Sequence, residues 1–264
     1  MPFAIRLHLA VSLVGLLSMG DYLSPAMDLP ANVGGIVLGI VMAIVAVSMA
    51  AGWHARWGAA LLVAAGPLGM AQFGFTPVLQ RIDLLGLAVF VAVAGAGRWS
   101  ADAELGRATD PTPLQAARAS WALRVGAGLA LIVVAFAEKL ANPQLALHFL
   151  ADHEQLNVAH QLGLHMSDLA FIRTAGAIEV LFGLLLISGA LPQVCVLVAG
   201  IPFNATLWFF GTTELVGHLP IYGAMLVLLV YGSQATLRDG VRAAWPWSTP
   251  QLRRPRASAL ATAK

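Results

Sequence analysis

Several polar side chains in the second half of the chain lie in otherwise apolar segments, and their types could bind a ligand or exchange protons. Glu214 and His218 are spaced i, i+4, so on a helix both would lie on one face. A charge in the hydrocarbon core of a membrane costs about 2.5–3.5 kcal/mol on insertion scales, so such a residue is paired or functional. The candidate ligand-binding residues are Glu138, Lys139, Glu179, Asn204, Glu214 and His218.

Two interpretations of these residues stay open. In the first, the glutamates and His218 surround a ligand pocket that opens at the outer side. In the second, Lys139 or Arg173 pairs with a glutamate, and His218 bonds a carbonyl group or sits at the membrane interface. The second interpretation is physically reasonable because long side chains near helix ends reach water at little cost.

A quinone would suit the first interpretation. A quinone site needs a histidine or an acid that exchanges protons with the quinone oxygen, beside an aromatic wall. The residues that could supply this wall are Trp208, Phe209 and Phe210.

Segment 143–168 is rich in histidine, a common metal ligand, so a metal or haem site is an alternative to the quinone site. If 145–161 were one helix, His153 and His160 would share a face but stand about 10.5 Å apart along its axis, too far for one ion. Ligands would then have to come from different elements, and the candidates are His153, His160, His165 and His218. The alternative is an amphipathic surface helix with its leucines and Phe149 toward lipid.

The composition requires apolar surroundings for most of the chain. Hydrophobic residues make up 59% and charged residues 11%, against about 25% charged in a soluble domain. A spanning helix needs about 20 mostly apolar residues, and we expect eight, near 4–20, 31–52, 57–75, 80–97, 120–141, 169–190, 192–211 and 215–232. The continuous apolar runs favour helices over strands. The predicted fold is an all-α integral membrane protein.

The charge and the cysteine content exclude other classes. The net charge of +2, without a basic stripe, argues against nucleic-acid binding. A single cysteine, Cys195, excludes an internal disulfide and a CxxC redox pair.

The distribution of Lys and Arg predicts the orientation. With eight spans and the N-terminus inside, only Arg81, Lys139 and Arg173 fall on the outer side. Basic residues favour the cytoplasmic side, so we expect both termini in the cytoplasm of a bacterial-type cell. Arg6 and the small residues around Ser18 also fit a cleavable signal peptide, in which case seven spans would remain.

The two halves resemble each other weakly. Arg6 precedes Pro25 by the same interval as Arg124 precedes Pro143. We therefore expect two parallel four-helix units joined by a cytoplasmic linker and followed by a basic cytoplasmic tail, with boundaries 1–100, 101–119, 120–233 and 234–264. An external segment, 143–168, would belong to the second unit. Chance similarity between apolar helices is the alternative.

Three stretches carry a resemblance to a known family. The first unit ends Gly-Ala-Gly-Arg-Trp-Ser-Ala-Asp at 95–102, the fifth span ends Glu-Lys-Leu at 138–140 before Pro143, and the sixth contains Gly-Ala-Ile-Glu-Val-Leu-Phe-Gly at 176–183. The chain in this respect resembles the DoxX-like family of four-helix membrane proteins, best over 120–232, as an apparent tandem duplication. The resemblance implies a redox or quinone-linked component that works with the lipid bilayer and other membrane redox subunits. Metal or haem binding at the outer face, or a non-catalytic accessory subunit or small-solute transporter, are the alternatives.

Overall fold

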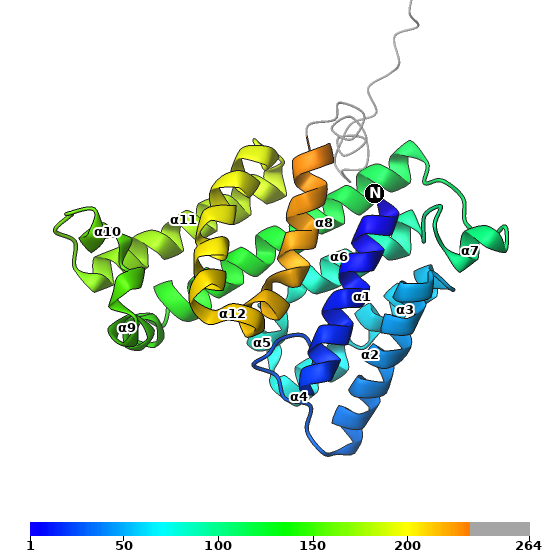
Figure 1. The fold of residues 1–264 in the computed structure, drawn as a ribbon, viewed down its shortest axis with the longest axis horizontal. Coiled ribbons are helices and arrows are strands. Elements are labelled where there is room, and N and C mark those ends of the chain that lie inside the picture. Colours follow the sequence, from blue (N-terminus) through cyan, green and yellow to red (C-terminus); the bar gives the residue numbers. More distant parts are fainter. Residues whose placement is uncertain (233–264) are drawn as a thin grey trace, which may run out of the picture.

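The computed structural model describes residues 1–232, and the secondary structure in this range is helical apart from one antiparallel bridge between Asp21 and Asp28 (Figure 1). This confirms the prediction of an all-helical chain. The predicted basic tail, 234–264, lies outside the described residues. The elements are α1 (Pro2–Met19), α2 (Val33–Ala51), α3 (Ala55–Ala64), α4 (Gly66–Phe73), α5 (Phe75–Leu79), α6 (Ile82–Ala94), α7 (Ala101–Glu104), α8 (Pro113–Ala135), the π-helical turn η1 (Phe136–Leu140), α9 (Pro143–Asp152), the 3-10 turn η2 (Glu154–Leu156), α10 (Val158–Gln161), α11 (Asp168–Ser188) and α12 (Pro192–Tyr231).

Within the described residues, five helices are long and apolar enough to cross a membrane: Pro2–Met19, Val33–Ala51, Pro113–Leu140, Asp168–Ser188 and Thr213–Val230. Helix α6 and the segment Pro192–Leu207 are apolar but shorter. Large apolar side chains on these helices are exposed, including Val47 at 67% and Leu197 at 61%. An exposed apolar surface of this kind suits lipid rather than water.

Helix α12 consists of two arms that meet at Gly211, whose φ of 66° and ψ of −137° are not helical. The arms run side by side in opposite directions, because Gln193 Nε2 donates to the Leu229 carbonyl oxygen at 2.7 Å and the rings of Phe203 and His218 lie 4.8 Å apart. Glycine tolerates this backbone conformation because it has no Cβ. The expected boundary between segments 192–211 and 215–232 lies at this glycine.

The expected segment 57–75 is divided into shorter helices, and the expected segment 80–97 contains one shorter helix, α6. Helices α3 and α4 cover the first, with Pro67 at the start of α4, and α5 and α6 lie on the other side of Gly74. Proline is tolerated in the first turn of a helix but not in its interior, which accounts for the new start at Gly66. Gly74, with φ at 92°, separates α4 from α5.

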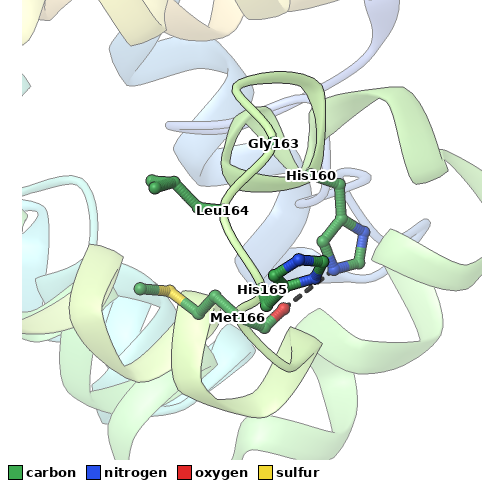
Figure 2. A pocket seen from close by; sticks show the side chains of 5 residues that line it. All are labelled: His160, Gly163, Leu164, His165 and Met166. Carbon is green, nitrogen blue, oxygen red and sulfur yellow. Dashed lines mark hydrogen bonds between the residues drawn. The ribbon is translucent and has the colours of Figure 1, made fainter.

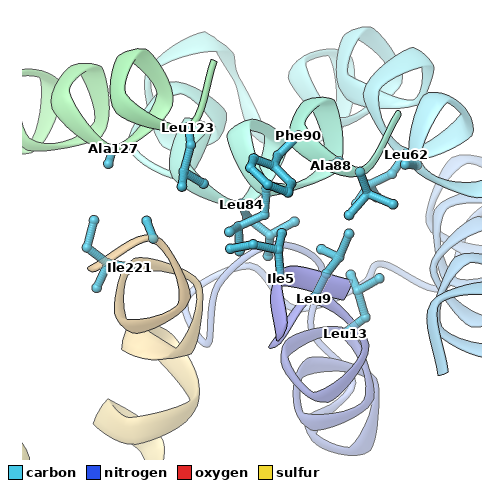
Figure 3. Packing of buried hydrophobic residues seen from close by; sticks show 14 of the residues in the cluster. Ile5, Leu9, Leu13, Leu62, Leu84, Ala88, Phe90, Leu123, Ala127 and Ile221 are labelled. Atoms are coloured by element: carbon cyan, nitrogen blue, oxygen red, sulfur yellow. The ribbon is translucent and has the colours of Figure 1, made fainter. Parts of the chain in front are cut away.

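The core joins the two halves of the chain (Figure 3). Buried residues of α1, such as Leu9, face Leu84 and Phe90 of α6, while α8 and the second arm of α12 contribute Leu123 and Ile221. Helices α6 and α8 approach closely, since a Cβ added at Gly86 would lie 3.1 Å from the Gly126 Cα. Small residues allow such backbone contact between membrane helices.

Segment 143–168 is not the single amphipathic helix that we considered. It contains α9, the turn η2 and α10. The backbone leaves the helical region at His153 (φ −137°, ψ 57°) and again at Asn157. The buried Asn157 side chain accepts from the Ala159 N–H and donates to the Asp168 carboxylate at 2.7 Å, which fixes the chain before α11. Leu145, Phe149 and Leu162 are exposed, as expected for a lipid-facing surface, whereas Leu156 is half-buried.

Candidate functional site

A π-helical turn ends α8 and carries two of the predicted site residues, Glu138 and Lys139. The Ala141 N–H donates to the Phe136 carbonyl oxygen at 2.9 Å, five residues back. Single π-helical turns inside or at the end of α-helices are rare and frequent at functional sites. The turn brings Lys139 against α11, where Gly176 leaves room: a Cβ at Gly176 would meet the Lys139 Cβ at 3.1 Å.

Lys139 and Glu179 form an ion pair with an Nζ–Oε2 distance of 3.1 Å. Both side chains are largely buried, at 22% and 29% exposed. Next to them, Gln80 Nε2 donates to Glu138 Oε1 at 2.8 Å and ties the end of α5 to η1. We call Gln80, Glu138, Lys139 and Glu179 the ion-pair group.

A second group surrounds His218 on the second arm of α12. Its Nδ1 lies 3.7 Å from Glu214 Oε1, and both residues lie on one face of the arm, as their spacing indicated. The Phe203 ring stands edge-on to the imidazole at 4.8 Å, and the Tyr222 ring lies 6.3 Å away. Within the described part of the chain, the buried His218 Nδ1 and Tyr222 hydroxyl have no hydrogen-bond partner.

Arg81 completes this histidine group from the start of α6, where Asp83 lies close to Arg81. Arg81 Nη1 donates to the Gly217 carbonyl oxygen at 3.4 Å, and its charge acts on both Asp83 and His218. Asp83 is 5% exposed, and its Oδ1 has no hydrogen-bond partner among the described residues. The histidine group is therefore Arg81, Glu214, His218 and Tyr222, and Asp83 adjoins it through Arg81.

Both groups lie toward the end of the molecule at which α1 ends. A Cβ at Gly217 would lie 3.6 Å from Pro25, in the connection between α1 and α2. Gln80 contacts the ion-pair group and Arg81 contacts the histidine group. Because these two residues are adjacent in sequence, the junction between α5 and α6 links the two groups. We call this end the distal face, and the end at which α1 begins the N-terminal face (Figure 1).

Two sequence candidates do not join these groups. Asn204 donates to the Gly200 carbonyl oxygen of its own helix at 2.7 Å and is exposed. Arg173, the other cation that we considered for pairing with a glutamate, is exposed and has no ion pair among residues 1–232. The side chains of Trp208, Phe209 and Phe210, the expected aromatic wall, lie outside those that the structure describes. Among the described side chains, the rings of Phe203 and Tyr222 lie beside His218.

The histidines of segment 143–168 are engaged separately. His160 Nε2 contacts the Met166 carbonyl oxygen at 2.8 Å, beside a surface hollow of about 330 Å³ that His165 also lines (Figure 2). His153 Nδ1 contacts the Phe149 carbonyl oxygen at 3.1 Å. Among the described residues, no three His, Cys, Asp or Glu side chains are close enough to hold a metal ion. The structure thus does not bring His153, His160, His165 and His218 together, and a metal or haem stays a prediction without a ligand set.

Two buried arginines have matching roles at the N-terminal face. Arg6 of α1 donates to the carbonyl oxygens of Met49 and Ala50 at the end of α2, and Arg124 of α8 donates to those of Leu186 and Ile187 at the end of α11, at 2.9 and 3.0 Å. The last carbonyls of a helix have no partner within it and carry partial negative charge, so a cation stabilises them.

The motif at 95–102 also has a structural role at this face. Arg6 reaches the carbonyl oxygens of Ala96 and Trp99, and Ser100 caps α7 by accepting from the Ala103 N–H. Asp102 accepts from the backbone N–H groups of His54 and Ala55 at the start of α3. Comparison with models of known protein families, with curated proteins and with solved structures gave no match. The resemblance to the DoxX-like family therefore stays a prediction from the sequence.

Proposed function

We propose that the chain is a quinone-binding membrane protein whose ligand contacts the histidine group. The observation that carries this proposal is the Tyr222 hydroxyl, which is buried without a hydrogen bond among the described residues and lies beside the His218 and Phe203 rings. A quinone headgroup is a flat ring with oxygens that accept hydrogen bonds and take up protons on reduction. A histidine, a phenol and an aromatic face are suitable partners for such a ligand.

Each residue of the group has a role in this proposal. Oxidation of a quinol releases two protons and two electrons. His218 accepts one proton, Glu214, 3.7 Å away, stabilises the resulting imidazolium, and the other proton passes to water. The Tyr222 hydroxyl donates to a quinone oxygen, and Arg81 fixes the start of α6 against the second arm of α12. The proposal assigns the two electrons of the quinol to a partner redox subunit of the membrane.

The proposal includes the architecture that the sequence suggested: eight spans in two parallel four-helix units of DoxX-like type, in a bacterial cytoplasmic membrane with both termini inside. Backbone conformation supports the duplication. Gly52 and Gly189 end α2 and α11 with φ of 66° and 74°, and two residues later His54 and Leu191 both have φ of 48°. The same interval in sequence separates Gly52 from Gly189 and Gly74 from Gly211, where the chain breaks between helices in each half.

The first test is the quinone content of protein purified in mild detergent, by solvent extraction and mass spectrometry. Wild-type protein should retain quinone, and His218→Ala should retain at least severalfold less. Asn204→Ala is the matched control, because Asn204 lies in the same helix and contacts only its own backbone in the described structure. Equal quinone content in all three proteins, or none in the wild type, would contradict the proposal.

A non-catalytic accessory role is the second candidate, and the ion-pair group favours it. Gln80–Glu138 and Lys139–Glu179 tie three helical segments together, as expected for a structural role. Under this interpretation Glu179→Gln and His218→Ala both leave membrane redox activity at the wild-type level. Loss of that activity in His218→Ala alone would favour the quinone site.

A further inference from the structure

A hollow of about 240 Å³ opens at the N-terminal face, far in the fold from the histidine group. It lies between the start of α3, the end of α6 and the segment that follows α7, which meet on the side of the molecule where the N-terminus lies (Figure 1). Its polar lining comes from His54, Arg56, Asp102 and Arg107, and Trp57 forms part of its rim. We call it the arginine hollow.

The charges around the arginine hollow do not balance. Both carboxylate oxygens of Asp102 are already bonded, to the N–H groups of His54 at 2.9 Å and Ala55 at 3.1 Å. Neither Arg56 nor Arg107 forms an ion pair with any residue in 1–232. Two guanidinium groups thus face the hollow without a carboxylate of their own.

The guanidinium groups are positioned by contacts that leave most of their donors available. Arg107 Nη1 lies 3.3 Å from His54 Nε2, and Arg56 Nη1 reaches only the Ala92 carbonyl oxygen, at 3.4 Å. Gly95 makes room for Arg56: a Cβ there would lie 3.1 Å from its Nε and Nη2 atoms, and the φ of 87° is one that side chains rarely adopt. Each guanidinium has five N–H donors, so both arginines can bond an additional anion.

Exposed tryptophans surround this part of the surface. Trp53, Trp57 and Trp99 are 52%, 76% and 75% exposed, and they lie at the end of α2, in α3 and just before α7. Tryptophan is enriched at the level of the lipid headgroups, where its ring is half in an apolar and half in a wet environment. The tryptophans place the arginine hollow at the depth where phosphate groups of lipids lie.

We propose that the arginine hollow binds a phosphate group, with Arg56 and Arg107 as its ligands and His54 orienting Arg107. Arginine matches phosphate geometry with paired N–H donors. The phosphate comes from an anionic phospholipid headgroup or from a free phosphate ion, two sources with the same chemistry at the binding atoms. This site is separate from the quinone site and does not depend on it.

The test is the ligand-dependent shift of the thermal unfolding midpoint of the full chain in an uncharged detergent. The protein is titrated with a soluble short-chain phosphatidylglycerol, with the corresponding phosphatidylcholine, with inorganic phosphate, and with sodium chloride at matched ionic strength. A ligand that binds only the folded state raises the midpoint in a saturable way. Arg56→Gln and Arg107→Gln are compared with Arg98→Gln, which removes one positive charge from the same face but from a surface pair with Asp110.

We expect phosphatidylglycerol to raise the midpoint more than phosphatidylcholine or chloride does. Its apparent affinity should fall about tenfold in Arg56→Gln and in Arg107→Gln, as expected for loss of a charge-assisted hydrogen bond, and stay unchanged in Arg98→Gln. An equal response to inorganic phosphate would identify a free phosphate site, and a response to the lipid alone a headgroup site. The proposal is overturned if neither anion exceeds chloride, or if Arg98→Gln weakens the response as much as the other two variants. The shift of each variant is measured from the midpoint of that same variant without ligand. A variant with a lower starting midpoint can therefore still be compared with the wild type.

Discussion

The Lys139 ammonium group lies 3.1 Å from the Glu179 carboxylate, and this contact joins the π-helical turn after α8 to the interior of α11. A helical α8 that continued without the π turn would rotate Lys139 to another face, since each residue turns an α-helix by about 100°. The ion pair and the unusual turn therefore depend on each other, and both adjoin Gly176, which allows the close approach.

The Glu179→Gln variant tests this ion pair. It leaves Lys139 without its partner in a largely buried position, so the free energy of unfolding should fall by about 1.5–3 kcal/mol, the range for hydrogen bonds to charged groups. Thermal or denaturant unfolding in detergent measures the change. The double variant Lys139→Met/Glu179→Gln should recover part of the loss, because it no longer leaves a buried charge unpaired; an additive loss would show that the two side chains do not interact.

The Gly189→Ala variant tests the contact between Arg124 and the end of α11. Gly189 has φ at 74°, and an added Cβ would lie 1.9 Å from Arg124 Nη2. We expect Gly189→Ala to lower the free energy of unfolding. The loss should exceed the roughly 1–2 kcal/mol that a left-handed backbone conformation costs a residue with a Cβ. Gly106→Ala is the matched control, since Gly106 has φ at 65° and open space around it. Equal losses in the two variants would mean that Arg124 moves aside without cost.

The buried arginines should not tolerate replacement by lysine. Arg6 bonds several carbonyl oxygens at once through its planar group, which a lysine ammonium cannot reproduce in the same geometry. Arg6→Lys should therefore lower the thermal midpoint clearly more than Arg98→Lys, which changes an exposed pair. Similar midpoints for the two variants would contradict the structural role of Arg6.

Asp21, in the connection after α1, should make stability depend on pH. Burial raises its pKa above the ordinary value, and the hydrogen bond with Asp28 and the charge of Asp28 add to this effect. The folded state then holds a proton that the unfolded state releases, so stability should fall as pH rises from about 3.9, the ordinary Asp value, to the raised pKa. Asp21→Asn should remove this part of the pH dependence. Asp110→Asn should remove a dependence of opposite sign, because hydrogen bonding and charge from Arg98 lower the pKa of Asp110.

The sequence predicted the helical class and the shared face of Glu214 and His218 because these depend on local patterns. Long apolar runs indicate helices, and the spacing of Glu214 and His218 placed them on one face. The sequence did not indicate Gln80 and Tyr222 as site residues, because neither carries a charge. Only tertiary packing brings them to Glu138 and His218. Asp83 belongs to the first half of the chain, and nothing in its local sequence indicates that it is buried close to Arg81, which contacts the second half.

Other differences between the predicted and the observed structure arise from backbone geometry, which cannot be predicted from amino-acid composition. The π-helical turn at 136–140 has an ordinary helical sequence, and the second break within 143–168 lies at Asn157, whose side chain bonds Asp168 far along the sequence. Asn204 was predicted as a site residue because polar groups are rare in apolar segments. Its side-chain amide instead donates a hydrogen bond to the Gly200 carbonyl oxygen, one turn earlier in the same helix. An amide can do this within its own helix, so its presence there is weak support for a site.

The most direct test of the central claim is the binding of a soluble short-chain benzoquinone to the purified protein in lipid nanodiscs. Wild type is compared with Tyr222→Phe, which removes one oxygen and keeps the ring. If the Tyr222 hydroxyl and His218 hold a quinone, the wild type should bind saturably and Tyr222→Phe about tenfold more weakly, the equivalent of one hydrogen bond. Identical binding by the two proteins, or no saturable binding by the wild type, would contradict the account.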